Sequence, residues 1–327
     1  MKYNFISIGG ATRDIVFLTS DGIMIDNHRD LLRQKLLAFE YGAKIKVNSF
    51  HHLFGGGAAN AAVNFANSGF KVACLANIGG DESGRAVLAN LKGRGVATSL
   101  MSISPSAFTG LSFILVSDEG ERIIFSNRLA NENLAISLKE KALLEQTEYI
   151  YLASLSGNWQ KTAKQIFSAK KPKIVWNPGA SQYKLGLKKL SPFLKRTEIL
   201  CVNKDEALEL VLSSASYRRK GLDFFKDVKN ILPILKAAGP NIVLITSGQE
   251  GADVYDGRNF YHQDIIKEKK RVDVTGVGDV FNSSFLIGMI LSRGDIKKSL
   301  YLGARNAASK IAHFGAQSGL LDLRKIK

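Results

Sequence analysis

The chain has 327 residues, of which 45% are hydrophobic, and its 45 Lys and Arg against 29 Asp and Glu give a formal net charge of +16. This length is sufficient for one large core, and no stretch approaches the ~20 apolar residues of a membrane helix. The apolar run Phe5–Ile8 is soon followed by Arg13 and is too short for a signal peptide, so none is expected. Cys74 and Cys201 lie in apolar runs, which predicts buried thiols in a reducing cytoplasm.

The positive charge alone fits solvated lysine-rich faces, an anion-attracting cleft or a nucleic-acid-binding surface. The lysines are scattered along the chain, in the segments Lys35–Lys46, Lys161–Lys173, Lys184–Lys195 and Lys267–Lys270. No helix-turn-helix, zinc-finger or RNA-recognition motif accompanies them. We therefore expect no nucleic-acid partner, and a basic, non-catalytic nucleic-acid-binding protein is the alternative from another class.

The first half of the chain predicts a strand, an irregular region and then alternating helices and strands. Gly9 and Gly10 follow the first apolar run, and Asp118-Glu119-Gly120 between two strand-like runs indicates a hairpin. The expected elements are strands at Tyr3–Gly9, Ile15–Leu18 and Lys44–Val47, a polar helix-like stretch at Asp26–Leu37, a helix at Ala58–Asn67, a strand at Val72–Asn77, a helix at Ser83–Lys92, and strands at Phe108–Ser117 and Arg122–Asn127.

The second half alternates regularly between short apolar runs and helical segments. Expected strands are Tyr149–Ala153, Lys173–Trp176, Glu198–Val202 and Ile242–Thr246, and the chain closes with helices at Gly278–Leu291 and Ile296–His313. Such alternation predicts βαβ units and a mostly parallel sheet. We expect one α/β domain over residues 1–327, with a small β lid assembled from about residues 11–50 and 107–128.

The segment Val272–Asp279 carries the most chemistry. Gly276 and Gly278 remove side chains where the chain enters a helix, so the backbone N–H groups of Gly276, Val277 and Gly278 are predicted to converge on an anion. Such a site stabilises a phosphoryl group in transfer, and Asp279 in the first turn can accept a proton from an attacking hydroxyl. On spacing alone, an ordinary helix start capped by Thr275 explains the segment equally well.

Asp273-Val274-Thr275-Gly276-Val277-Gly278-Asp279-Val280-Phe281 resembles the signature of the ribokinase-like (PfkB) carbohydrate kinases, with Val274 and Val277 as mild departures. Further similarities follow in family order over nearly the whole chain. They are Gly9-Gly10-Ala11-Thr12-Arg13-Asp14, Gly55-Gly56-Gly57-Ala58-Ala59-Asn60, Ile78-Gly79-Gly80-Asp81, Asn203-Lys204-Asp205-Glu206 and Thr246-Ser247-Gly248-Gln249-Glu250-Gly251. The resemblance implies a three-layer sandwich with a mostly parallel central sheet and a small β lid.

The resemblance also implies an ATP-dependent transfer of the γ-phosphoryl group to a hydroxyl of a sugar or sugar-like substrate. Asp279 would be the catalytic base, with Gly276, Val277 and Gly278 as the anion hole. The implied substrate-binding residues are Asp14, Gly55, Gly56, Asn60 and Arg128. The implied ATP-binding residues are Asn203, Glu206, Thr246, Gly248, Gly251 and Asn306.

The residues by themselves leave other interpretations open. Asp14 could make an Asx-turn, and Asn203 with Glu206 could be a capping box. Gly55–Asn60 lacks the last glycine of a dinucleotide fingerprint, which leaves a plain turn as its alternative. No Gly-x-x-x-x-Gly-Lys-Ser/Thr sequence occurs, which excludes a P-loop enzyme.

The resemblance implies Mg²⁺, held through water by Glu206. It also suggests K⁺ beside the anion hole, surrounded by Asp273, the carbonyls of Thr275 and Gly315, and Ser318. A cation there would strengthen the field on the phosphoryl oxygens. Ser318 fits this set only if its loop is one residue shorter than usual.

The substrate is left open among a free sugar, a nucleoside as in adenosine-like kinases, and a sugar acid as in 2-keto-3-deoxygluconate kinases. Arg128 lies where relatives place lid residues that meet the substrate, and it could contact a carboxylate or a phosphate, or only solvent. Lids of two chains pack together in many relatives, which suggests a homodimer through the lid.

Overall fold

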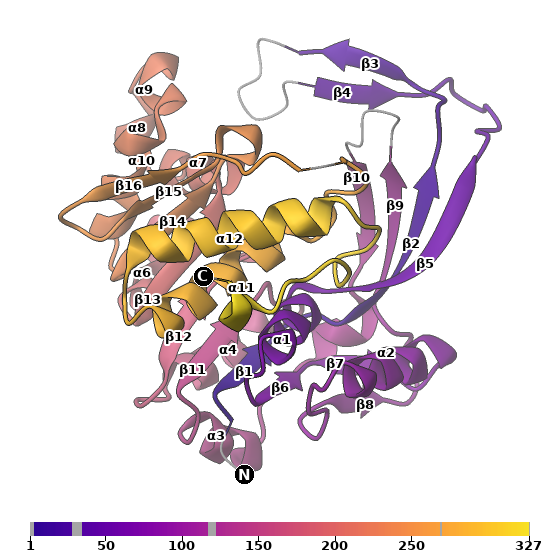
Figure 1. The fold of residues 1–327 in the computed structure, drawn as a ribbon, viewed down its shortest axis with the longest axis horizontal. Helices are drawn as coiled ribbons and strands as arrows, with labels where there is room; N and C mark the ends of the chain where they lie inside the picture. The colour runs from indigo at the N-terminus through magenta and orange to yellow at the C-terminus, as the bar shows by residue number, and fades with distance from the viewer. Residues whose placement is uncertain (1–2, 28–34, 117–121, 269, 327) are drawn as a thin grey trace.

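In the computed structural model, which describes residues 3–27, 35–116, 122–268 and 270–326, an eight-stranded sheet forms the centre (Figure 1). Six neighbouring strands of this sheet run parallel, and two further strands at one edge continue it antiparallel. The spatial order is β16 (Phe260–Gln263), β15 (Ala252–Tyr255), β14 (Ile242–Thr246), β13 (Thr197–Asn203), β12 (Lys173–Trp176), β11 (Tyr149–Leu152), β1 (Phe5–Ile8) and β6 (Val72–Leu75).

Helices cover both faces of this sheet, and each face has its own hydrophobic cluster. Phe5 of β1 packs into one cluster, and Ile6 and Ile8 pack into the other, because successive side chains of a strand point to opposite faces. Strands buried on both faces read as continuous apolar runs, which is why they are recognisable in the sequence. The arrangement confirms the predicted α/β class with a mostly parallel sheet.

The first face is covered by α3 (Leu138–Leu144), α4 (Trp159–Phe167), α6 (Leu187–Leu194), α7 (Lys204–Leu212), α9 (Leu222–Lys226) and α10 (Val228–Ala237). The second is covered by α1 (Gly57–Asn67), α2 (Glu82–Gly93), α11 (Val277–Leu291) and α12 (Ile296–Ile311). Shorter elements are β7 (Asn77–Gly79), β8 (Ser102–Ser104), η1 (Leu129–Asn133), α5 (Ala180–Tyr183), α8 (Ala215–Arg218), η2 (Gly248–Glu250) and η3 (Leu323–Lys325).

A second sheet, which we call the lid sheet, stands beside the carboxyl ends of the central strands (Figure 1). Within the described residues it has four strands in the order β10 (Arg122–Asn127), β9 (Leu111–Val116), β2 (Thr12–Leu18) and β5 (Ser49–Gly55). The β9 and β10 strands pair antiparallel, as the hairpin signal predicted, and the turn signal at residues 118–120 lies outside the described residues.

Two expectations for this region were wrong. Lys44–Val47 is not a strand, because the partner of β2 is the later segment Ser49–Gly55. The helix expected at Asp26–Leu37 is also not formed in its described part, since β3 (Ile23–Asp26) pairs with β4 (Lys35–Ala38) and residues 28–34 lie outside the described chain. Strand pairing is a tertiary effect that a polar, weakly periodic sequence does not announce.

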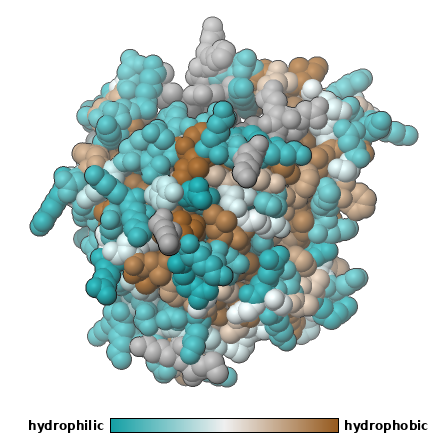
Figure 2. Space-filling model, in the orientation of Figure 1, coloured by the Kyte–Doolittle hydropathy of each residue, from teal (hydrophilic) through white to brown (hydrophobic). Residues whose placement is uncertain are grey.

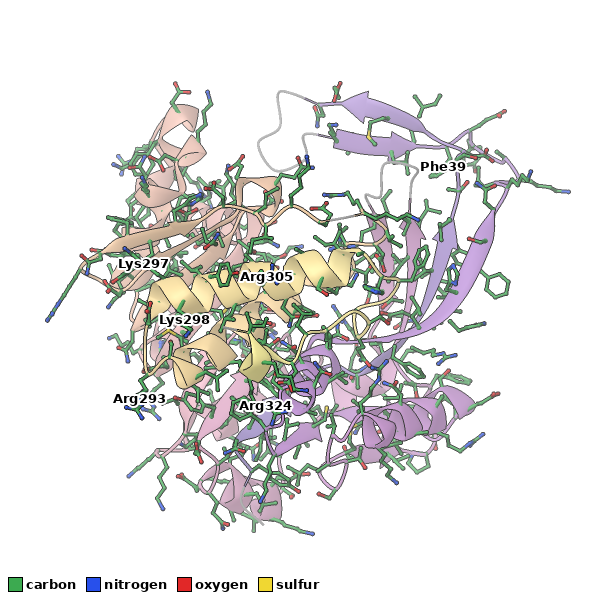
Figure 3. The ribbon with its side chains drawn as sticks, in the orientation of Figure 1. Phe39, Arg293, Lys297, Lys298, Arg305 and Arg324 are labelled. Atoms are coloured by element: carbon green, nitrogen blue, oxygen red, sulfur yellow. The ribbon has the colours of Figure 1, made fainter. Side chains whose placement is uncertain are left out.

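Many of the basic residues lie on solvated surfaces. Lys297, Lys298 and Arg305 of α12, together with Arg293 and Arg324, are exposed and point away from the sheet (Figure 3). Hydrophilic side chains cover most of the face seen in Figure 2, with hydrophobic residues gathered near its centre. Within the described residues, no helix is long and apolar enough to span a bilayer.

Candidate active site

Two adjoining pockets lie at the carboxyl edge of the central sheet in the described part of the chain, and the lid sheet forms one side of the second. Their volumes are about 330 and 280 Å³, and Arg122, Asn203, Thr246 and Gly278 line both. We call the larger one the nucleotide half and the smaller one the substrate half of a single cleft. Ligands of open α/β sheets bind at this edge, because strand ends and helix starts converge there.

The start of α11 lies where the two halves meet. Gly276 has φ +73°, and a Cβ on it would lie 2.9 Å from the Cα of Ala316, so the turn requires glycine. Among the described residues, the N–H groups of Gly276, Gly278 and Asp279 have no hydrogen-bond partner. Val277 differs from the prediction, because its N–H lies 3.3 Å from the carbonyl oxygen of Val274 and closes the preceding turn. N–H groups without partners at a helix start can bind an anion.

Asp279 lies in the first turn of this helix and lines the substrate half. Its Oδ2 accepts a hydrogen bond of 2.8 Å from Nδ2 of Asn60, and Oδ1 of Asn60 accepts one of 3.1 Å from Gln317. Gln317 therefore fixes which way the Asn60 amide points. Burial raises the pKa of Asp279, and the hydrogen bond from Asn60 and the charge of Arg122 oppose the rise. A carboxylate so placed can act as a general base.

Asp14 faces the cleft from the lid strand β2, not from a loop that follows a strand of the central sheet. The side chain is buried, and its Oδ1 accepts a hydrogen bond of 2.9 Å from Oγ1 of Thr12. Burial raises the pKa of Asp14, and hydrogen bonds from Thr12 and Ser112 work against it. Gly55 lies directly against this carboxylate, where any Cβ would collide with it. Gly56 has φ +91° and begins α1. Gly55 thus leaves room for the carboxylate of Asp14, and Gly56 provides the positive φ from which α1 begins.

Asn203 and Glu206 form a capping box at the start of α7, with distances of 2.8 Å from the Glu206 N–H to Asn203 Oδ1 and 3.0 Å from the Asn203 N–H to Glu206 Oε2. Both residues also line the substrate half, so the capping box does not exclude a binding role for them. Burial, together with the smaller effect of the charge of Asp279, raises the pKa of Glu206 to about 7.

This pair of carboxylates fits Mg²⁺. The charge of Asp279 disfavours that of Glu206 in the substrate half, and a divalent cation would remove that penalty. Mg²⁺ binds through one or two carboxylates together with substrate phosphates, and it keeps several waters. The described residues contain no group of three or more side chains that could hold a metal ion.

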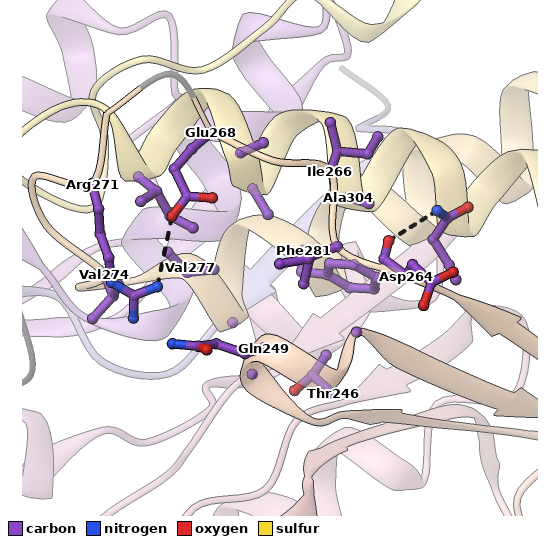
Figure 4. A pocket seen from close by; sticks show the side chains of 18 of the residues that line it. Thr246, Gln249, Asp264, Ile266, Glu268, Arg271, Val274, Val277, Phe281 and Ala304 are labelled. Atoms are coloured by element: carbon purple, nitrogen blue, oxygen red, sulfur yellow. Dashed lines mark hydrogen bonds and ion pairs between the residues drawn. The ribbon is translucent and has the colours of Figure 1, made fainter.

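The nucleotide half is mainly apolar (Figure 4). Phe281 and Val277 of α11 face Ala304, Ala307 and Ile311 of α12, and small residues on that helix leave room for a flat ring. Thr246 at the end of β14, with Gly248 (φ +56°) and Gly251 (φ +88°) after it, closes the opposite side. The apolar wall was not predicted, because an amphipathic helix shows the same residue pattern.

The structure places Asn306 away from the cleft, which corrects its predicted role in framing the nucleotide. Its side chain is fully buried between helices. Nδ2 donates to Oδ1 of Asn64 at 2.9 Å and to Oγ of Ser284 at 2.8 Å, and Oδ1 accepts from the N–H of Leu321 at 2.8 Å. These bonds use the whole amide, so Asn306 joins α1, α11 and α12.

The predicted K⁺ site is also not formed as expected. The N–H of Gly315 donates a hydrogen bond of 2.8 Å to Oδ2 of Asp273. The carbonyl oxygen of Gly315 lies 3.5 Å from the N–H of Ser318. The ammonium of Lys310 lies against Asp273, 2.5 Å from its carbonyl oxygen and 3.6 Å from Oδ2. The described donor set therefore does not fit K⁺, because the ammonium of Lys310 and the N–H of Gly315 already use the oxygens of Asp273.

Arg128 lines the substrate half from the end of the lid sheet and is exposed. Its charge lowers the pKa of Asp14, against the larger effect of burial. Arg122 of β10 lines both halves, and no motif in the sequence indicated this role. The role could have been inferred from the position of Arg122 in a strand, because alternate residues of that strand face the cleft.

A carboxylate set between an anion-binding helix start and a polar pocket is typical of a phosphotransferase. The chain belongs to the pfkB family of carbohydrate kinases, which residues 20–323 match. This finding confirms the predicted family and activity class. The chain is therefore a phosphotransferase with an alcohol acceptor and ATP as its co-substrate.

Individual relatives show how broad this family is. The chain is similar to an uncharacterized sugar kinase of Archaeoglobus fulgidus, with 28% identity over 259 residues that cover 77% of this chain and 96% of the relative. Its fold is similar to that of Arabidopsis thaliana ribokinase solved with ribose and ATP, with a TM-score of 0.78, 19% identity and coverage of 99% and 97% of the two chains. A nucleoside kinase of Methanocaldococcus jannaschii has a TM-score of 0.74, 20% identity and 99% coverage of each chain.

Proposed function

We propose that this kinase transfers the γ-phosphoryl group of ATP to a hydroxyl of a free sugar, with Asp279 as the general base. The single observation that supports this role best is the position of its carboxylate. It lies in the first turn of α11, beside N–H groups without partners, and it is held by Asn60, whose own orientation Gln317 fixes. Asp14 faces the same pocket from the lid sheet.

In the proposed reaction, Asp14 and Asn60 hold neighbouring hydroxyls of the sugar, since a buried carboxylate and an amide can accept and donate several hydrogen bonds. Asp279 takes the proton of the hydroxyl that attacks. A new P–O bond forms to the sugar oxygen while the bond between the γ-phosphorus and the ADP oxygen breaks. The proton then leaves Asp279 for solvent as the products dissociate.

The protein stabilises the charge of the transferring group through the N–H groups of Gly276 and Gly278. Mg²⁺, held near Glu206 and Asn203, would neutralise part of the phosphate charge when bound. We assign the nucleotide itself to the apolar half beside Phe281, with Thr246, Gly248 and Gly251 around its polar part.

A sugar acid is the second candidate substrate, because Arg128 lines the substrate half and its charge reaches both Asp14 and Asp279. A guanidinium recognises a carboxylate through paired, charge-assisted hydrogen bonds. Losing such a contact costs about 1.5–3 kcal/mol, roughly 10- to 100-fold in KM.

The test is a panel of ribose, fructose, 2-keto-3-deoxygluconate and adenosine, assayed for ADP release with Mg²⁺ by the wild type and by Arg128→Gln. We expect the highest kcat/KM for a free sugar, with less than a threefold change in the variant. A tenfold rise in KM confined to the sugar acid would favour the second candidate. A nucleoside preferred tenfold over every sugar would contradict both.

We also propose that two copies associate through the outer face of the lid sheet. Phe50, Phe17, Phe113 and Phe125 form a row across its four strands on the side away from the cleft, and Phe125 is 60% exposed. The rings of Phe17 and Phe113 stack at 6.0 Å. A contiguous exposed apolar patch marks an interaction surface, and sedimentation equilibrium measures the association.

A cytoplasmic location stays a prediction.

A further inference from the structure

Lys310 is the most deeply buried charged side chain near the cleft, with 0% of its surface exposed. It lies in the last turn of α12, and its ammonium is 2.5 Å from the backbone carbonyl oxygen of Asp273 and 3.6 Å from the carboxylate oxygen Oδ2. Lysine is almost never fully buried unless it is paired, because burying an ammonium costs several kcal/mol. The pairing with Asp273 is therefore a built feature of the fold.

The partner, Asp273, holds two other segments of the site. Its Oδ1 accepts the N–H of Thr275 at 2.8 Å, and its Oδ2 accepts the N–H of Gly315 at 2.8 Å. The backbone N–H of Asp273 in turn donates to the carbonyl oxygen of Ile311, next to Lys310 in α12. The pair thus joins the end of α12, the loop after it and the loop that leads into α11.

This loop leads directly to the anion hole. Gly276 lies three residues after Asp273, and it packs against Ala316 so closely that a Cβ on Gly276 would lie 2.9 Å from the Cα of Ala316. A fixed positive charge behind the loop also adds to the field that the helix start directs at a phosphoryl group. Both effects place Lys310 in a position to act on the reaction without touching the substrate.

The ligands of the ammonium are a backbone carbonyl and a carboxylate, which are the hard oxygen donors that an alkali cation also prefers. One protonated lysine side chain supplies the same single charge as part of the chain, without the loss of freedom that a bound ion pays. Burial lowers the pKa of this ammonium to about 8, and the charge of Asp273 opposes that fall. We propose that Lys310 is a positioning residue that takes the place of a dissociable monovalent cation, so that phosphoryl transfer by this enzyme does not require K⁺. This inference rests on the proposed function of the anion hole.

The experiment compares the wild type, Lys310→Ala and Lys310→Met, each in KCl and in tetramethylammonium chloride of equal ionic strength. Two quantities are measured: kcat for the best sugar, and the melting temperature without substrate. We expect the wild type to change less than twofold in kcat and not at all in melting temperature. In tetramethylammonium, Lys310→Ala should lose at least tenfold in kcat with little change in sugar KM.

K⁺ or ammonium should restore the Ala variant saturably and raise its melting temperature, because truncation leaves space beside Asp273. Lys310→Met is the matched control, since it removes the charge but fills the space, and no cation should restore it. Tenfold K⁺ activation of the wild type would overturn the inference, even if neither variant folds. An Ala variant with wild-type kcat in tetramethylammonium would overturn it as well. A wild type that phosphorylates nothing would instead refute the proposed function.

Discussion

Replacing Asp279 with Asn separates the basicity of this side chain from its structural contacts. The amide keeps an oxygen that can accept the hydrogen bond from Asn60, whose orientation is fixed by Gln317. What the variant loses is the ability to accept a proton, which contributes about 10²- to 10⁴-fold to turnover. That range corresponds to about 3–5 kcal/mol in the activation free energy.

The same substitution should not lower the stability of the fold, although it lowers turnover. Burial raises the pKa of Asp279, so the folded state binds its proton more tightly than the unfolded chain does. Stability is therefore lost as pH rises through the folded pKa, and at pH 7.5 the carboxylate destabilises the fold. Asp279→Asn should consequently have an equal or higher free energy of unfolding.

The assay is steady-state ADP release with the best sugar, together with calorimetric binding of ATP, which should stay within threefold of the wild type. Asp205→Asn is the matched control, because Asp205 is also a carboxylate in a first helical turn but does not line either half of the cleft. A kcat of Asp279→Asn within threefold of the wild type would refute the general-base assignment.

Two further predictions test Glu206 and Asn306. Burial raises the pKa of Glu206 to about 7 from 4.5, so the folded state loses stability as pH rises across that window. Relative to the wild type, Glu206→Gln should be equally stable near pH 4.5 and more stable at pH 8 by at most about 3 kcal/mol, less any solvent screening. Urea unfolding measures this, and a difference independent of pH would contradict it. Asn306→Ala should lower the free energy of unfolding by on the order of 3 kcal/mol, because three buried hydrogen bonds lose a partner. The KM of this variant for ATP should change less than twofold. A tenfold rise in that KM would show that Asn306 takes part in binding the nucleotide.

The sequence was most informative where a pattern is local. Apolar runs bounded by glycine and polar residues gave the strands β1, β11 to β14 and the helices α11 and α12 close to their observed bounds. The glycines before Asp279 indicated a helix start, because only glycine permits the backbone of Gly276 there. The order of the motifs then identified the family.

Local patterns failed where partners distant in the sequence decide the structure. The segment Lys35–Ala38 is a strand only because it pairs with Ile23–Asp26. The family resemblance implied that Asn306 binds ATP, yet its side chain turns into the core, and Ala304 and Ala307 of the same helix line the cleft.

By itself, then, the sequence determined the α/β class, the kinase family and the residues at the start of α11, since each depends on periodicity or on the backbone freedom of glycine. The tertiary structure decided which side chains meet. It brought Asp14 to the cleft from the lid sheet, turned Gln317 onto Asn60, and set the ammonium of Lys310 beside Asp273. The last two contacts join residues that are 37 and 257 positions apart in the sequence. No local sequence pattern encodes the packing that brings such residues together.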